Sequence, residues 1–247
     1  MTGGALVQVV GIGAGDPEYL TSQAAAAIAR TDVFFTIDKG DPTSDLAELR
    51  ALLLSRHARP GHRVVTAPDP ERDRAAGDYP GAVAEWQGRR GALYAAMIAE
   101  ELPAGGVGSF LVWGDPALYD GTLPILARIP GIEVVSVPGI SAVSALAAAH
   151  RLVLHRVGRP FTVTTGRRLA EGGMPGDDVV VLLDARCAFA GLPPAGIDIF
   201  WGAYLGTRDE LLVAGDLAAV RDEIRTVRAA ARDRKGWIMD TYLLRRR

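Results

Sequence analysis

The chain has 247 residues, enough for one large domain or two modest ones, and its 49% hydrophobic and 23% charged residues are ordinary for a globular protein. Its net charge of -2 provides no basic field, so no nucleic-acid partner is expected. No apolar run is long enough to span a membrane, and the N-terminus lacks the pattern of a signal peptide, which predicts a soluble, cytoplasmic protein without membrane contact.

Two features of the composition concern ligands. Lysine stands only at positions 39 and 235, so arginine supplies almost all of the 27 basic residues. Arginine pairs bidentately with carboxylates and phosphates, which suits a polyanionic substrate, although a compositional bias explains most of these residues equally well. Cys187 is the single cysteine, which excludes an internal disulfide and a thiolate metal cluster. We expect a buried structural thiol and no metal.

The first part of the chain alternates predicted strands and helices. The predicted strands cover residues 6–12, 33–37, 64–66, 107–113 and 132–137. The predicted helices cover 21–30 after the cap Thr21, 46–57 after the caps Ser44 and Asp45, 93–101 after a long polar segment at 68–91, 123–129, and 141–149. This order predicts a parallel sheet covered by helices on both faces.

The pattern changes near residues 154–160. Predicted strands follow at 161–165, 179–183, 198–205 and 211–214, the last two paired, with a helix at 217–232 and an extended segment at 237–243. Short connections between neighbouring strands favour antiparallel pairing. We therefore expect an N-terminal parallel-sheet α/β domain at 1–155, a C-terminal mixed-sheet α/β domain at 156–247, and a cleft between them.

Two motifs carry Gly-Asp-Pro where the chain leaves a predicted strand: VGIGAGDPEYLT at 10–21 and VWGDPALYDGT at 112–122. Ligands of open α/β sheets bind at such loops. The first motif departs from a dinucleotide fingerprint, because Asp16 stands where the third glycine is needed and Pro17 removes an N–H. A phosphate-free flat or cationic ligand is favoured. Each Asp-Pro pair alone is equally typical of a turn, whereas the two together favour a site.

A third strand-to-helix junction, VPGISAVSALAAA, covers residues 137–149. Ser141 suits a helix N-cap, and the small residues that follow allow a helix or a ligand to approach closely. Turn chemistry alone does not readily explain three such junctions at one sheet edge.

These three motifs, in this order and spacing, resemble the tetrapyrrole methylases, S-adenosylmethionine-dependent enzymes of corrin and sirohaem biosynthesis. TIDKG at 36–40, the segment 78–101 with Trp86, Arg89, Arg90 and Tyr94, LLDARCAF at 182–189, and KGWIMDTYLL at 235–244 are similar to the members that methylate precorrin-5. One departure is Trp113, because many relatives have a glycine there. The wall of the cofactor pocket should therefore differ at this position.

The resemblance implies a homodimer of two-domain subunits that binds S-adenosylmethionine and a precorrin, a tetrapyrrole. It implies methylation of precorrin-5 at C1 with release of acetate, giving precorrin-6A and S-adenosylhomocysteine. Transferred position by position, cofactor contacts are expected from the first domain at Pro17, Trp113, Gly114, Asp115, Leu118, Ser141 and Ala142, and from the second at Leu183, Leu205 and Gly206.

Release of acetate needs a water to attack the acetyl carbonyl, and a carboxylate is a suitable general base. Asp16 is the predicted base, and Tyr119 is predicted to orient the substrate. The pair Arg89 and Arg90 is either solvated charge or a dock for substrate carboxylates. Histidines at 57, 62, 150 and 155 lack the spacing of helical zinc ligands.

Three alternatives remain open from the sequence. A sister methylase acting at another ring carbon differs in product mass. A relative that modifies ribosomal RNA or an elongation factor is disfavoured, in the RNA case, by the absence of a basic stripe. A nucleotide-binding regulatory module would bind NAD in preference to S-adenosylhomocysteine.

Overall fold

The structure, a computed structural model, describes residues 4–38, 44–71 and 79–247. Its residues group into two compact units, one of Met1–Gly13 and Pro17–Ile140 and one of Ala14–Asp16 and Ser141–Arg247. The division after Ile140 precedes the boundary expected at residue 155. It does so because helix α5 (Ala142–Ala149) packs on strands of the second unit.

The first unit is built on a parallel sheet. Its strands are β1 (Ala5–Gly11), β2 (Val33–Asp38), β3 (Arg63–Pro68), β4 (Val107–Val112) and β5 (Ile132–Val137), in the order β3-β2-β4-β1-β5. Every pairing is parallel, as predicted, so the carboxyl ends of all five strands meet at one edge. Valine-rich strands of this kind are stable only when both faces are buried.

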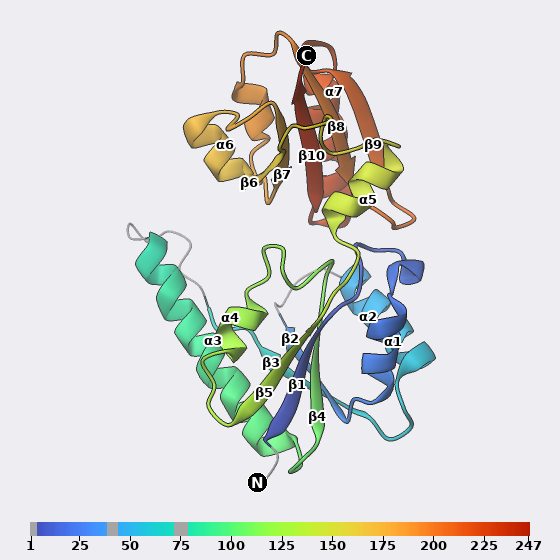
Figure 1. The fold of residues 1–247 in the computed structure, drawn as a ribbon, viewed down its shortest axis with the longest axis vertical. Coiled ribbons are helices and arrows are strands. Elements are labelled where there is room, and N and C mark those ends of the chain that lie inside the picture. The colour runs from blue at the N-terminus through green and yellow to red at the C-terminus, as the bar shows by residue number, and fades with distance from the viewer. Residues whose placement is uncertain (1–3, 39–43, 72–78) are drawn as a thin grey trace. The chain divides into compact units, whose positions relative to one another are not determined.

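Helices cover both faces of this sheet (Figure 1). Helices α1 (Ser22–Ala29) and α2 (Ser44–His57) lie on one face, and α3 (Tyr79–Glu101) and α4 (Thr122–Leu126) on the other. Alternate residues of β1 serve the two cores: Val10 packs with α1 and α2, whereas Val9 packs with α3 and α4. Thr21 caps α1 as predicted, while the side chains of the predicted caps Ser44 and Asp45 lie outside the described residues.

Helix α3 begins much earlier than predicted. It starts at Tyr79, within the polar segment that precedes the helix predicted at 93–101. Side chains on successive turns stabilise this polar part: Arg89 pairs with Glu85 at 3.0 Å, and the Arg90 guanidinium lies 4.2 Å from the ring centre of Trp86. A helical segment stabilised by such polar pairs has no apolar stripe, so its sequence lacks the periodicity of an amphipathic helix.

The second unit contains a mixed sheet, as predicted. Its strands are β6 (Thr162–Thr165), β7 (Asp178–Leu182), β8 (Ile197–Ala203), β9 (Leu211–Asp216) and β10 (Asp240–Arg246), in the order β6-β7-β10-β8-β9. Strands β6 and β7 are parallel, whereas the C-terminal strand β10 lies antiparallel between β7 and β8. The carboxyl ends of β7 and β8 therefore share an edge with the start of β10.

The helices of this unit divide between the two faces of the sheet. Helices α6 (Gly166–Gly172) and α7 (Leu217–Lys235) and the 3-10 turn η2 (Ala188–Gly191) share one core with the sheet, and α5 lies on the opposite face (Figure 1). The sequence pattern did not predict α6, η2 or the 3-10 turn η1 (Pro17–Tyr19), because all three are short. Within the described ranges, no helix is both long and apolar enough to cross a bilayer.

Candidate active site

Three loops meet at the carboxyl edge of the first sheet, after β1, β4 and β5. The loops after β1 and β4 join through a pair of reciprocal backbone hydrogen bonds. Gly13 N donates to Gly114 O at 3.3 Å, and Gly114 N donates to Gly13 O at 2.8 Å. Both glycines have a positive φ, +84° and +68°, which other residues rarely adopt. The first two predicted motifs are thus in direct contact.

Close backbone approach explains two further glycines at this edge. A Cβ on Gly11 would lie 2.7 Å from both the Gly114 oxygen and the Gly139 nitrogen, and one on Gly139 would collide with the same oxygen. Three chain segments therefore pass one another at backbone contact. A backbone packed so closely presents its own N–H and C=O groups, rather than side chains, to a ligand.

Asp115 ties two of these loops together. One carboxylate oxygen accepts a hydrogen bond from Ala117 N at 2.8 Å and forms a local turn, and the other accepts one from Gly139 N at 2.9 Å. The second bond links the loop after β4 to the loop after β5. Hydrogen bonds to an ionised acceptor are stronger than neutral ones, so Asp115 fixes the geometry of this edge.

The other predicted residues of the first unit lie in different environments. Trp113 packs beside the α1–α2 core, and Leu118 N donates to Asp115 O at 3.2 Å. Tyr119 has φ +56° and a side chain that is 47% exposed. A non-glycine residue held in the left-handed region costs about 1–3 kcal/mol, and such strain clusters at functional sites. Pro17, within the first motif, begins η1.

Arg50 on α2 lies at the same end of the sheet, where β2 and β4 separate. The pairing of β2 with β4 stops at Phe35 and Phe110, although both strands continue. Arg50 donates from Nε and Nη2 to the Leu111 oxygen at 3.2 and 2.7 Å, and so satisfies a carbonyl that β2 does not reach. Burial lowers the pKa of this guanidinium, partly offset by the charge of Asp120.

In the second unit, the residue before the predicted base lies against a predicted cofactor loop. The segment Ala14–Asp16 belongs to this unit, and a Cβ on Gly15 would lie 2.5 Å from the Leu205 oxygen and 2.7 Å from Thr207 Cγ2. Asp16, which is half-buried, directly follows Gly15 in the chain and so comes next to the residue that packs against Leu205. Gly206 has φ +74° and donates from its backbone N to Glu210 Oε2 at 2.8 Å.

Leu183 directly follows β7 in a strained and exposed conformation. Its φ is +54° and its side chain is 65% exposed, which is unusual for a leucine that directly follows a buried strand.

Ser141 caps α5 by accepting a hydrogen bond from Ser144 N at 3.2 Å, and Ala142 is the first residue of that helix. The junction predicted from the third motif is thus confirmed as a helix start.

A buried polar network lies directly beneath Leu183. Asp184, 4% exposed, accepts hydrogen bonds from Arg186 N at 3.0 Å, Ala188 N at 2.6 Å and the Tyr242 hydroxyl at 2.6 Å. Burial, together with this carboxylate, raises the pKa of Tyr242, so the phenol remains a donor. The loop after β7 is thereby held on the central strand β10.

Arg228 on α7 extends the network to the start of β10. It donates to the Asp184 carbonyl at 2.7 Å and to Asp240 Oδ2 at 2.9 Å, and Asp240 Oδ2 also accepts from Trp201 Nε1 at 2.9 Å. Burial raises the pKa of Asp240 and opposes the charge on Arg228, but Asp240 outweighs burial and the pKa of Arg228 rises. None of these residues was predicted as part of the site. The sequence carries one signal for them, because an acidic residue, Asp184, directly follows the apolar run VVVLL at 179–183.

Two other predictions concern reactive or substrate-binding groups. Arg90 is 8% exposed and makes a bidentate pair with Asp69 at 2.7 and 2.6 Å, so it is engaged internally. Arg89 binds Glu85 and the Glu71 carbonyl. Cys187 is half-buried, and burial raises the pKa of its thiol, which fits the structural role predicted for it.

The model of the Tetrapyrrole (Corrin/Porphyrin) Methylases matches residues 7–221, which include all three loops of the first sheet edge. The chain belongs to the tetrapyrrole methylases. A curated precorrin-6A synthase [deacetylating] from Sinorhizobium sp. is 42% identical over 97% of this chain and 95% of its own length. The resemblance seen in the motifs is thus confirmed at the level of the family.

Solved structures of this methylase family share the fold. A putative cobalamin synthesis related protein (CobF) from Corynebacterium diphtheriae is 34% identical, covers 98% of each chain and has a TM-score of 0.84. A uroporphyrin-III C-methyltransferase from Thermus thermophilus complexed with S-adenosylhomocysteine is 21% identical, covers 97% and 96%, and has a TM-score of 0.59. The second likeness supports the fold alone.

Proposed function

We propose that this chain is a methyltransferase of corrin biosynthesis that methylates precorrin-5 at C1 and releases acetate to give precorrin-6A. The observation that carries the proposal is the 42% identity over nearly the full length of a deacetylating precorrin-6A synthase. The joined loops of the first sheet edge add physical support, because they present a backbone surface at the position where α/β sheets bind ligands.

We infer that S-adenosylmethionine is the methyl donor, and its sulfonium supplies a methyl group already activated for transfer. The first motif and the loop after β4 suit a ligand without phosphate, since Asp16 and Asp115 bring negative charge and Pro17 offers no N–H. The proposed contacts are those from the family resemblance: Pro17, Trp113, Gly114, Asp115, Leu118, Ser141, Ala142, Leu183, Leu205 and Gly206. The strained backbone of Leu183 and the positive φ angles of Gly114 and Gly206 support this assignment.

For the methyl transfer itself, the protein has mainly to orient two reactants. Precise positioning is worth roughly 7–11 kcal/mol of a barrier, and rigid loops are what provide it. Asp115 holds the loop after β4 against Gly139, and the Asp184–Tyr242 hydrogen bond holds the loop that carries Leu183. These groups act as positioning residues, each through the backbone that it fixes.

Acetate release additionally needs water to attack the acetyl carbonyl. We propose Asp16 as the base that accepts the proton from this water, and Tyr119 as a group that orients the substrate. The placement of the Ala14–Asp16 segment against Leu205–Thr207 supports a fixed position for the carboxylate. The exposed, strained Tyr119 supports a role toward a ligand.

The test is the variant Asp16→Asn, measured for acetate in a single turnover with enzyme in excess over precorrin-5. Asparagine keeps the shape of the side chain but cannot take a proton from water. We expect acetate release to fall by about 10²–10⁴-fold, the usual contribution of general-base catalysis, with S-adenosylhomocysteine affinity unchanged. Tyr119→Phe is the companion variant, and it should raise KM more than it lowers kcat.

Normal acetate formation by Asp16→Asn would show that this residue only caps the turn before Pro17. Product mass tests the reaction as a whole, because the proposed step gains a methyl group and loses an acetyl group. A gain of methyl alone would assign the chain to a sister methylase that acts at another ring carbon.

A homodimer and a cytoplasmic location are also proposals, and both rest on the family resemblance. Light scattering in solution tests the first. The expected mass is twice the 26.1 kDa of one chain, and a single-chain mass would overturn it.

A further inference from the structure

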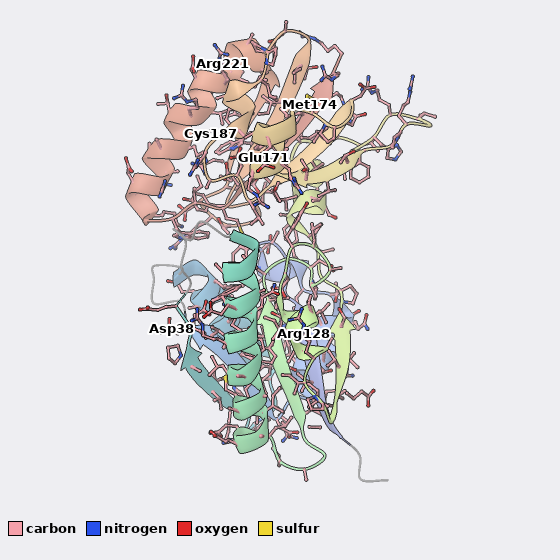
Figure 2. The ribbon with its side chains drawn as sticks, turned by 90° about the vertical axis from the view of Figure 1, so that its left-hand side faces the viewer. Asp38, Arg128, Glu171, Met174, Cys187 and Arg221 are labelled. Atoms are coloured by element: carbon pink, nitrogen blue, oxygen red, sulfur yellow. The ribbon has the colours of Figure 1, made fainter. Side chains whose placement is uncertain are left out.

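An arginine-lined cavity of about 380 Å³ lies in the second unit, between α7 and the loop after β7. Its lining comes from that loop, with Ala185, Arg186 and Cys187, and from α7, with Arg225, Arg228, Ala229, Arg232 and Asp233. Figure 2 labels Cys187, which lines the cavity, and Arg221, which lies on α7. The α7 residues recur every three or four positions and so share one helix face.

The charge inside this cavity is mostly uncompensated. Arg228 forms the buried floor, 7% exposed, and Asp240 neutralises it at 2.9 Å. Arg186 and Arg232 are exposed, and neither side chain pairs with an acid anywhere in the described ranges. Arg225 makes only an exposed contact of 3.4 Å with Asp222. Asp233 is the single acidic residue of the lining, so positive charge is in excess.

The shape and chemistry of the lining favour a carboxylate-bearing ligand. The cavity is larger than a single small ion needs, and the two alanines leave its space open. Guanidinium forks bind carboxylates in pairs of parallel hydrogen bonds. The thiol of Cys187 contributes no opposing charge, because burial raises its pKa and keeps it protonated.

We propose that this cavity, the Arg186–Arg232 pocket, is a carboxylate-binding site. The ligand is a molecule with several carboxylates: either the macrocyclic substrate, through its acetate and propionate arms, or a free small polycarboxylate. The first source rests on the proposed function, whereas the site itself does not. The loop that carries Arg186 also carries Leu183, so a carboxylate bound here would fix the same loop.

Calorimetric titration with citrate tests the site. The variant is Arg186→Glu/Arg232→Glu, and the matched control is Arg128→Glu, an exposed arginine of the first unit labelled in Figure 2. We expect at least a tenfold loss of citrate affinity in the double variant and none in the control. Equal affinity in wild type and double variant, or an equal loss in the control, would overturn the site. Tighter binding of phosphate than of citrate would overturn its assignment to carboxylates.

Steady-state kinetics with the tetrapyrrole then distinguish the two sources. A raised KM in the double variant, with kcat and S-adenosylhomocysteine affinity unchanged, identifies the substrate arms. An unchanged KM together with lost citrate binding identifies a free polycarboxylate. If wild type shows no methyl transfer, the proposed function fails while the citrate result still stands. Arg186→Gln/Arg232→Gln, which removes charge without reversing it, repeats the titration should the first variant fold poorly.

Discussion

Single residues at the edge of the first sheet act through the backbone that they fix. Only glycine fits at positions 11 and 139, because the Gly114 carbonyl occupies the space of a Cβ. Both carboxylate oxygens of Asp115 accept hydrogen bonds from backbone N–H groups. A side chain engaged in this way shapes the candidate site through the backbone that it holds in place. Substitution of such a residue should displace the loop, and should therefore lower both ligand affinity and the stability of the protein.

We expect Asp115→Ala to weaken S-adenosylhomocysteine binding about tenfold or more, and Asp16→Ala to weaken it less. Removing Asp115 releases Gly139 N, whereas Asp16 is assigned to the chemical step. A hydrogen bond to a charged group contributes about 1.5–3 kcal/mol, and 1.4 kcal/mol corresponds to about a factor of ten in affinity. Calorimetry on both variants measures the difference. Equal losses would contradict this division of roles.

The turns and the helix cap of the candidate site were predictable from the sequence because their signals are local. Glycine, aspartate and proline at strand ends act within a few residues, so Gly114, Asp115 and the Ser141 cap were all predicted from short motifs. Asp184 was not predicted as a site residue, because its partner Tyr242 stands 58 positions away. Only the insertion of β10 between β7 and β8 brings the two together.

At the scale of elements, length and amphipathic pattern decided which predictions held. The strands of both sheets were predicted within a few residues, since buried valine runs are distinctive. Helix α3 begins earlier than predicted because its first turn holds Pro80 and Gly81, which are weak helix formers, and α6 has only seven residues. The central place of β10 was not predictable from local pattern, because strand order is a property of the whole sheet.

We expect Tyr242→Phe to destabilise the protein by about 1–3 kcal/mol, since it removes a donor from the buried Asp184 carboxylate. Tyr204→Phe is the matched comparison, because the Tyr204 hydroxyl donates at 2.6 Å to the neutral Trp237 carbonyl. The loss should be smaller there. Thermal unfolding of both variants measures it, and a larger loss in Tyr204→Phe would show that the carboxylate does not depend on this donor.

At the scale of the whole molecule, the two units contain sheets of different construction. The first is all parallel, with the loops of the candidate site at its carboxyl edge, and the second is mixed, with its C-terminal strand at the centre. In the second, ion pairs anchor the ends of the strands. Asp178, at the start of β7, binds Arg245 of β10 at 2.5 Å and Arg156 at 3.2 Å while fully buried.

The stability of the protein should therefore depend on pH through Asp178. Burial alone would raise the pKa of this carboxyl, but the hydrogen bonds from Arg245 and Arg156 outweigh it and hold the pKa below its ordinary value. The unfolded chain then binds the proton at a higher pH than the folded one. The stabilising contribution is complete above the unfolded pKa of about 3.9 and is lost as the pH falls through the lower, folded pKa.

Asp178→Asn tests this dependence. Urea unfolding should show the variant to be less stable than wild type at about pH 6, with a difference that shrinks as the pH falls below about 4, where wild type also loses the charge. Asp222→Asn is the control, because Asp222 makes only an exposed contact with Arg225, and exposed pairs contribute little. Its difference from wild type should be small at both pH values. If the difference for Asp178→Asn did not change with pH, the carboxylate would stabilise the fold by its shape and hydrogen bonding and not by its charge.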